Sequence, residues 1–102
     1  MRKILHGKLY DTDTARYIGS KQSIYYKSDY RYFEEGLYKK KTGEFFLYGE
    51  GGPASRYAEY LESGGCIGGK QIIPLSENEA KEWAEKNLTV GEYEELFGIC
   101  EE

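Results

Sequence analysis

The chain has 102 residues, which is enough for one hydrophobic core and too few for two, so we expect residues 1–102 to form a single domain. Its formal net charge is −4, and it has neither a signal-peptide core after Met1 nor the roughly 20 apolar residues that cross a bilayer. We therefore expect a cytoplasmic protein. Cys66 and Cys100 lack a zinc-ligand spacing, and a reducing compartment disfavours a disulfide, so both should be free thiols.

Aromatic residues make up 16% of the chain, and eleven of them are tyrosines. A tyrosine ring buries well, but its hydroxyl needs a hydrogen-bond partner or water. Tyrosines are therefore typical both of half-buried sheet faces and of protein interfaces.

Charge is distributed unevenly along the sequence. Residues 1–75 contain twelve Lys and Arg and nine Asp and Glu, whereas residues 76–102 contain two and nine. An acidic C-terminal part repels phosphate backbones and attracts basic surfaces, and a merely solvated helical face explains the same pattern equally well.

The first third of the chain predicts short strands. Residues 4–10 alternate weakly and lead into a turn cluster at 11–14, and residues 15–19 favour a second strand. Residues 20–29 form a polar, tyrosine-rich connection in which residues 24–26 could form a short strand.

Residues 32–49 carry the clearest local pattern, two β-prone runs separated by Thr42 and Gly43. A two-residue hairpin loop there places Lys41 opposite Glu44. The hairpin is apolar on both faces, so each face needs a cover, or one remains an exposed aromatic surface. We interpret its carboxylates as charges at strand edges that discourage aggregation, and not as paired catalytic acids: Glu34, Glu35, Glu44 and Glu50.

The second half of the chain predicts helices around one more strand. Pro53 and the apolar spacing of residues 54–61 predict a short middle helix, and residues 70–75 predict a last strand. Two capping boxes begin two further helices, ending near Asn87 and Gly98. The cap residues are Ser76 with Glu79 and Thr89 with Glu92. The predicted fold class is α+β, an antiparallel sheet of four or five strands with the middle helix and two C-terminal helices packed on it.

Enzyme chemistry finds little support in the sequence. His6 is the only histidine, and no nucleophile elbow or oxyanion motif accompanies it, so we interpret it as a strand residue. One histidine and two separated cysteines fall short of the four ligands of zinc. We therefore expect a binding protein without a metal or cofactor, and not an enzyme.

The glycine-rich segment before the predicted middle helix offers an alternative function. Free amides at such a loop favour anions, although the lysine and hydroxyl of a P-loop are lacking. A small-ligand or nucleotide site there would use Gly49, Gly51, Gly52, Ser55 and Arg56. Single-stranded nucleic-acid binding through Lys39–Lys41 ranks third, because the acidic C-terminal part opposes counterion release.

Several segments resemble one family of small proteins. The resemblance lies in Phe46–Pro53, Ser55–Ala58, Ile73–Ser76, Glu79–Ala84 and Glu92–Gly98, and it extends to Gly7–Thr12. The resemblance covers nearly the whole length of the chain. The family occurs in low-GC Gram-positive bacteria and is often encoded on phages, plasmids or conjugative elements. Many of its members have histidine where this chain has Tyr48. The resemblance implies an accessory protein that inhibits a host defence system, as an anti-CRISPR or anti-restriction protein does.

Composition and resemblance together predict a non-enzymatic inhibitor or adaptor whose protein partner is a nucleic-acid-binding defence complex. Carboxylates would replace phosphates in a basic groove, and tyrosines would anchor the contact. The predicted interface combines the tyrosines of the polar connection with the acidic helical face: Tyr25, Tyr26, Tyr30, Tyr32, Glu82, Glu85 and Glu94. An uncovered hairpin face or edge strand would pair two copies, so a monomer and a homodimer both remain open.

Overall fold

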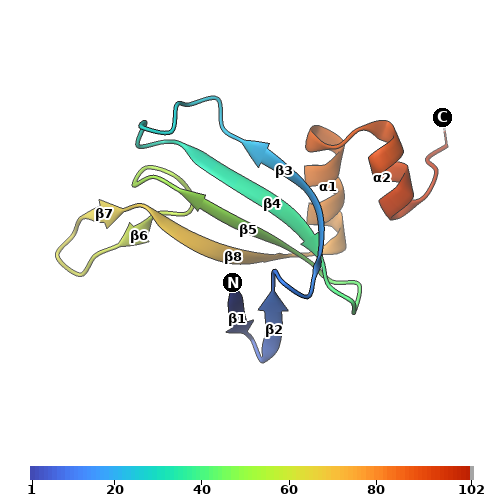
Figure 1. Ribbon diagram of the computed structural model, residues 1–102, viewed down its shortest axis with the longest axis horizontal. Coiled ribbons are helices and arrows are strands. Elements are labelled where there is room, and N and C mark those ends of the chain that lie inside the picture. Colours follow the sequence, from blue (N-terminus) through green and yellow to red (C-terminus); the bar gives the residue numbers. More distant parts are fainter. Residues whose placement is uncertain (102) are drawn as a thin grey trace.

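A four-stranded antiparallel sheet forms the centre of the computed structural model, which describes residues 1–101 (Figure 1). The strand order is β3-β4-β5-β8, so β4 and β5 lie in the interior of the sheet. Two small hairpins, β1-β2 and β6-β7, extend from it, and two helices follow at the C-terminus. The elements are β1 Arg2–Leu5, β2 Lys8–Asp11, β3 Arg16–Gln22, β4 Phe33–Lys39, β5 Phe45–Gly51, β6 Glu59–Tyr60, β7 Cys66–Ile67, β8 Gly69–Leu75, α1 Glu77–Asn87 and α2 Val90–Phe97. The α+β prediction is confirmed.

Both faces of the sheet are apolar, as the sequence predicts, and each has a cover. On one face Leu37, Phe45 and Leu47 pack against Ala80 and Trp83 of α1. On the opposite face Phe46 and Ile72 of the sheet pack with Tyr10 of β2, so the N-terminal hairpin covers this face in part. The helices and this hairpin therefore complete two separate small cores.

The hairpin of β4 and β5 has a different register from the predicted one. Glu44 pairs with Lys40 and not with Lys41, because the backbone N–H of Lys40 donates to the Glu44 carbonyl at 2.7 Å. The loop thus has three residues, and Gly43 at its third position has φ +94°. A three-residue hairpin loop usually ends in a left-handed residue, as this one does. The Thr-Gly pair in the sequence fits both this loop and a two-residue turn, so it does not determine the register.

The N-terminal strand predicted over residues 4–10 is wrong, since these residues form most of a hairpin. His6 and Gly7 both have positive φ, 53° and 77°, and they make the two-residue turn between β1 and β2. Two consecutive left-handed residues match the twist of the flanking strands. The predicted strand at 24–26 is also wrong, because these residues lie in the irregular connection between β3 and β4.

The predicted middle helix is wrong as well. Residues 53–57 form turns, and the chain then enters β6. The Ser55 hydroxyl accepts from the backbone N–H of Tyr57 at 3.2 Å and donates to the Gly52 carbonyl at 2.7 Å. These side-chain bonds compete with helical ones, so the apolar spacing of the segment reflects packing of Tyr57 and Ala58 into the interior.

Both C-terminal capping boxes are confirmed. The Ser76 hydroxyl accepts from the Glu79 amide at 3.1 Å, and the Thr89 hydroxyl accepts from the Glu92 amide at 3.2 Å. In return, the backbone N–H of each cap residue donates to the glutamate carboxylate, and these hydrogen bonds lower the pKa of both carboxyl groups below the ordinary value. Within residues 1–101, neither helix has the length and apolar character that a membrane crossing requires.

Candidate protein-binding surface

The predicted interface residues do not form one surface. The tyrosines lie in the connection between β3 and β4, at the end of the sheet that also carries the β6-β7 hairpin, whereas the glutamates lie on α1 and α2 towards the opposite end (Figure 1). The molecule extends about 50 Å along its longest axis. These residues therefore belong to two separate surfaces.

We call the first surface the aromatic end. It consists of large apolar side chains that are exposed on the β3-β4 connection and on the β6-β7 hairpin. In the connection, Ile24 is 94% exposed, Tyr26 88% and Tyr30 73%. The hairpin adds Tyr60, Leu61 and Ile67, of which Tyr60 is 82% exposed. Exposed apolar side chains gathered in this way at one end are typical of a protein-interaction site.

Only part of the predicted tyrosine set belongs to the exposed group. Tyr25 is half-buried, with the Arg31 guanidinium 4.0 Å above its ring. Tyr32 is also half-buried, and its hydroxyl donates to Glu34 at 2.9 Å. Desolvation, followed by the contact with Glu34, raises the pKa of Tyr32. Tyr26 and Tyr30 are therefore the tyrosines of this set that are free to contact a partner.

Sequence reasoning missed Ile24 and the β6-β7 hairpin. Ile24 is an apolar residue inside a polar, tyrosine-rich connection, and this isolation is the signal that could have found it. Tyr60 and Leu61 were not predicted to be exposed, because Leu61 matched the apolar spacing of the predicted middle helix, which does not form. The wrong prediction of a helix thus left the β6-β7 part of the aromatic end unpredicted.

The connection that bears Tyr26 and Tyr30 is held in place by a local ion pair. Arg31 donates from its backbone amide and its guanidinium to Asp29, at 2.8–3.0 Å. These hydrogen bonds from Arg31 lower the pKa of Asp29 to about 2. A loop whose backbone is already held in one conformation loses less entropy when it binds.

Glycines join the connection and the β6-β7 hairpin to the end of β5. A Cβ at Gly52 would lie 2.5 Å from the Tyr30 carbonyl oxygen, and one at Gly68 would lie 2.7 Å from the Gly51 carbonyl oxygen. Both distances are too short for any other residue, so the backbones touch here only because these positions are glycine. A shallow hollow of about 410 Å³ between the two segments includes Lys27 and Lys70 in its lining.

The same contacts occupy the amides of the predicted anion loop. The N–H groups of Gly52 and Ala54 donate to the carbonyls of Tyr32 and Tyr30 at 2.8 Å, and that of Ser55 donates to Gly52. Gly51 faces the Ser55 hydroxyl, and the Arg56 guanidinium lies 3.8 Å from Glu35. The loop thus serves internal packing, and its geometry gives no support to a phosphate site.

A buried carboxylate lies beneath this loop. Glu35, on the interior strand β4, is 5% exposed, accepts from the Tyr57 hydroxyl at 2.9 Å and accepts from the Trp83 indole at 2.6 Å. Glu34, Glu35 and Glu50 all lie on the interior strands β4 and β5, so their interpretation as strand-edge charges is wrong. A catalytic carboxylate must reach the proton it transfers, whereas both oxygens of Glu35 are engaged inside the protein. Its role is to join the loop, β4 and α1.

Gly49 makes the Glu35 cluster possible. Gly49 lies directly opposite Glu35 on β5, and the Tyr57 ring covers it so closely that a Cβ would collide with the ring. Desolvation, and then the Glu35 charge, raises the pKa of the Tyr57 hydroxyl well above its ordinary value. Tyr57 therefore stays protonated and remains a hydrogen-bond donor to the carboxylate.

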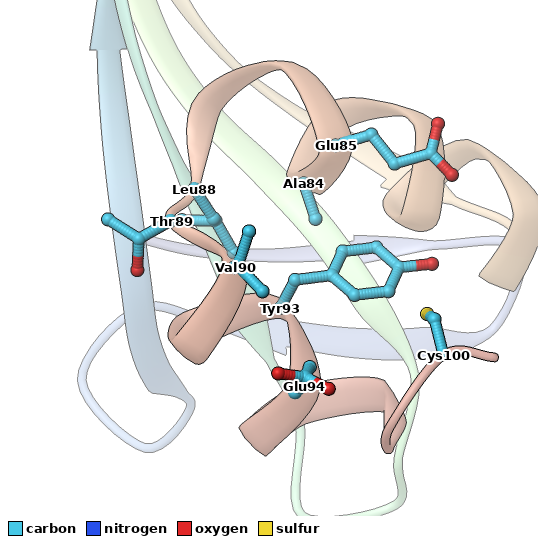
Figure 2. Close-up of a pocket in the computed structure, with 8 residues that line it drawn as sticks. All are labelled: Ala84, Glu85, Leu88, Thr89, Val90, Tyr93, Glu94 and Cys100. Carbon is cyan, nitrogen blue, oxygen red and sulfur yellow. The ribbon is translucent and has the colours of Figure 1, made fainter. Parts of the chain in front are cut away.

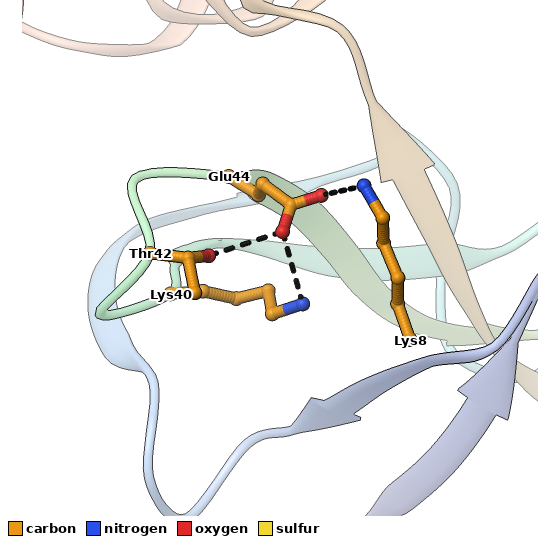
Figure 3. Close-up of polar contacts among 4 residues, drawn as sticks. All are labelled: Lys8, Lys40, Thr42 and Glu44. Carbon is orange, nitrogen blue, oxygen red and sulfur yellow. Dashed lines mark hydrogen bonds and ion pairs between the residues drawn. The ribbon is translucent and has the colours of Figure 1, made fainter.

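A second polar cluster holds the N-terminal hairpin on the sheet. The Glu44 carboxylate accepts from Lys8 at 2.8 Å, from Thr42 at 3.1 Å and from Lys40 at 3.4 Å (Figure 3). The hydrogen bond from Lys8 is the largest of several causes that lower the pKa of Glu44 to about 2. All four residues join β2 to the β4-β5 turn, so the cluster stabilises structure on the surface.

The remaining candidates for chemistry are scattered. His6 lies in the β1-β2 turn, and Cys66 in β7 and Cys100 after α2 are exposed thiols. Among residues 1–101, no three His, Cys, Asp or Glu side chains are placed to hold a metal ion. The geometry of these residues therefore suggests no shared reaction centre.

No family model, curated protein or solved structure matches this chain. The family resemblance seen in the sequence stays a prediction.

Proposed function

We propose that this chain is a non-enzymatic protein-binding module, an inhibitor or adaptor that acts by occupying the surface of a partner protein. The observation that carries the proposal is the aromatic end, where Ile24, Tyr26 and Tyr30 are exposed on a loop that internal bonds hold in place. Exposed aromatic side chains on an ordered backbone are typical of the anchors that dominate the binding energy of many interfaces.

The resemblance supports a more specific form of this proposal. It points to a cytoplasmic defence nuclease of a Gram-positive host, and hence to inhibition by direct binding. The acidic helical end adds a negative charge that would speed encounter with a basic protein surface, and this effect weakens as salt is added.

The test compares two matched isoleucine variants. Ile24 at the aromatic end and Ile99 after α2 are 94% and 88% exposed, so replacing either with serine removes a similar apolar area without touching a core. We expect tagged wild-type protein and Ile99→Ser to recover the same partner from the host, and Ile24→Ser and Tyr26→Ser to recover much less.

The recovered partner is then purified, and its affinity is measured directly. Loss of an exposed anchor should weaken binding about tenfold or more, because anchor side chains contribute about 2 kcal/mol or more each. Equal affinity of the wild type, Ile24→Ser and Tyr26→Ser would contradict the proposal, provided that all variants melt at the wild-type temperature.

A further inference from the structure

A groove between α1 and α2 forms a second surface, distant from the aromatic end. It has a volume of about 320 Å³, which is at the small end of the range for ligand pockets, roughly 300–1,000 Å³. Its apolar lining comes from the end of α1 and the first turns of α2, namely Ala84, Leu88, Val90 and Tyr93, and Cys100 lies at its edge (Figure 2).

The apolar lining is held by the core beneath it. Leu88 packs against the buried cluster under the helices. The Tyr93 ring lies 5.0 Å from the Phe97 ring, which in turn lies 5.5 Å from the buried ring of Phe45. Val90, by contrast, is 76% exposed, so the groove is open to solvent on the side of α2. The groove thus has an apolar base that packs on the core, and it is open to solvent on one side.

Two carboxylates flank this groove. Glu85 of α1 and Glu94 of α2 both line the groove, and neither makes an ion pair with any of residues 1–101. The ion pairs of these helices involve other carboxylates, Glu95 with Arg16 and Glu77 with Lys81. Two uncompensated negative charges beside an apolar groove select for an occupant that is both cationic and apolar.

We propose that the groove binds a basic amphipathic segment of a partner protein, with an apolar side chain between Val90 and Tyr93 and lysine or arginine side chains at Glu85 and Glu94. The charge of the C-terminal part, two basic and nine acidic residues over 76–102, favours the same occupant over an acidic or neutral one. This site is independent of the aromatic end, so either can fail without the other.

The test uses a synthetic amphipathic peptide of about 16 residues, leucine on one face and lysine on the other, titrated into the full chain. A second peptide carries glutamate in place of lysine. We expect the lysine peptide to bind with NMR shifts confined to α1, α2 and residue 100, and the glutamate peptide not to bind.

Charge reversal then identifies the groove. The single variants Glu85→Lys and Glu94→Lys should each weaken binding of the lysine peptide about tenfold or more. Glu82→Lys is the matched control, because Glu82 is an exposed residue of α1 that does not line the groove, and it should change affinity less than about twofold. Val90→Ser should weaken binding too, whereas Ile99→Ser should not.

Three results would overturn the proposal. They are absence of binding by the lysine peptide, equal weakening by all three charge reversals, and shifts centred on the sheet. Ile24→Ser and Tyr26→Ser should leave peptide binding unchanged, so these variants separate a failure of the groove from a failure of the aromatic end.

Discussion

The indole Nε1 of Trp83 lies 2.6 Å from Oε2 of Glu35, and the Tyr57 hydroxyl lies 2.9 Å from the other carboxylate oxygen. One buried charge thus receives a donor from α1 and a donor from the loop before β6. A buried carboxylate is costly unless it is paired and hydrogen-bonded, so these two bonds, together with the Arg56 guanidinium 3.8 Å from the carboxylate, stabilise Glu35 in the interior.

Removal of one donor should therefore destabilise the protein. Trp83→Phe leaves the Glu35 oxygen unpaired, and we expect it to lose about 1–3 kcal/mol of the free energy of unfolding. Glu35→Gln should lose less, because an amide oxygen can accept from the indole while the amide nitrogen donates to Tyr57. Urea denaturation of the wild type and the two variants measures their free energies of unfolding. An unchanged midpoint for Trp83→Phe would contradict the prediction.

Two glycine-to-alanine changes should have opposite signs. At Gly49 an added methyl collides with the Tyr57 ring, so we expect a loss of about 1–3 kcal/mol from overpacking. At Gly91, in α2, an added methyl meets nothing within 4 Å, and alanine favours the helix by up to about 1 kcal/mol. Thermal melts of both variants test this, and a tolerated Gly49→Ala would refute the close contact.

The β1-β2 turn offers a stabilising change. His6 has φ 53°, a conformation that asparagine adopts with less strain than histidine. His6→Asn should therefore raise stability, by up to about 1 kcal/mol, whereas Gly7→Ala at φ 77° should lower it by about 1–2 kcal/mol. If His6→Asn is instead destabilising, the turn does not have the described conformation.

The Glu44 cluster predicts a specific dependence of stability on pH. The pKa of Glu44 is about 2 in the folded protein and 4.5 ordinarily, so the folded state binds this proton more weakly than the unfolded state. The stabilisation is complete above about pH 4.5 and is lost as pH falls towards 2. The stability difference between wild type and Glu44→Gln should vanish over this range.

Lys8→Met provides the control for this assignment. Lys8 donates the hydrogen bond that lowers the pKa of Glu44 most, so its removal should move the Glu44 titration, followed by carboxyl-carbon NMR, back towards 4.5. A titration that stays near 2 in Lys8→Met would show that Thr42 and Lys40 suffice.

The C-terminal helices could be predicted from the sequence because their signals are local. A Ser or Thr cap and a glutamate three residues later determine where α1 and α2 begin, whatever they pack against. The turn segment at 53–57 shows the opposite case. There a helical spacing of apolar residues was overridden by hydrogen bonds of Ser55 and by burial of Tyr57 against Gly49.

The binding surface was predictable only in part for a related reason. Composition identified the tyrosine-rich connection, and Tyr26 and Tyr30 are indeed exposed. It could not indicate that Arg31 would cover Tyr25, or that the acidic helices would lie at the opposite end, since both depend on tertiary contacts. Glu35 was misjudged likewise, because strand order decides which carboxylates are interior.

Trp83 is the only tryptophan of the chain, and the bond to Glu35 places its indole between α1 and the sheet. Its fluorescence therefore reports on the docking of α1 from a position that neither exposed surface includes. Emission should shift to longer wavelength only when the helix leaves the sheet and water reaches the ring. A ligand that bound at either end without loosening the fold would leave this spectrum unchanged.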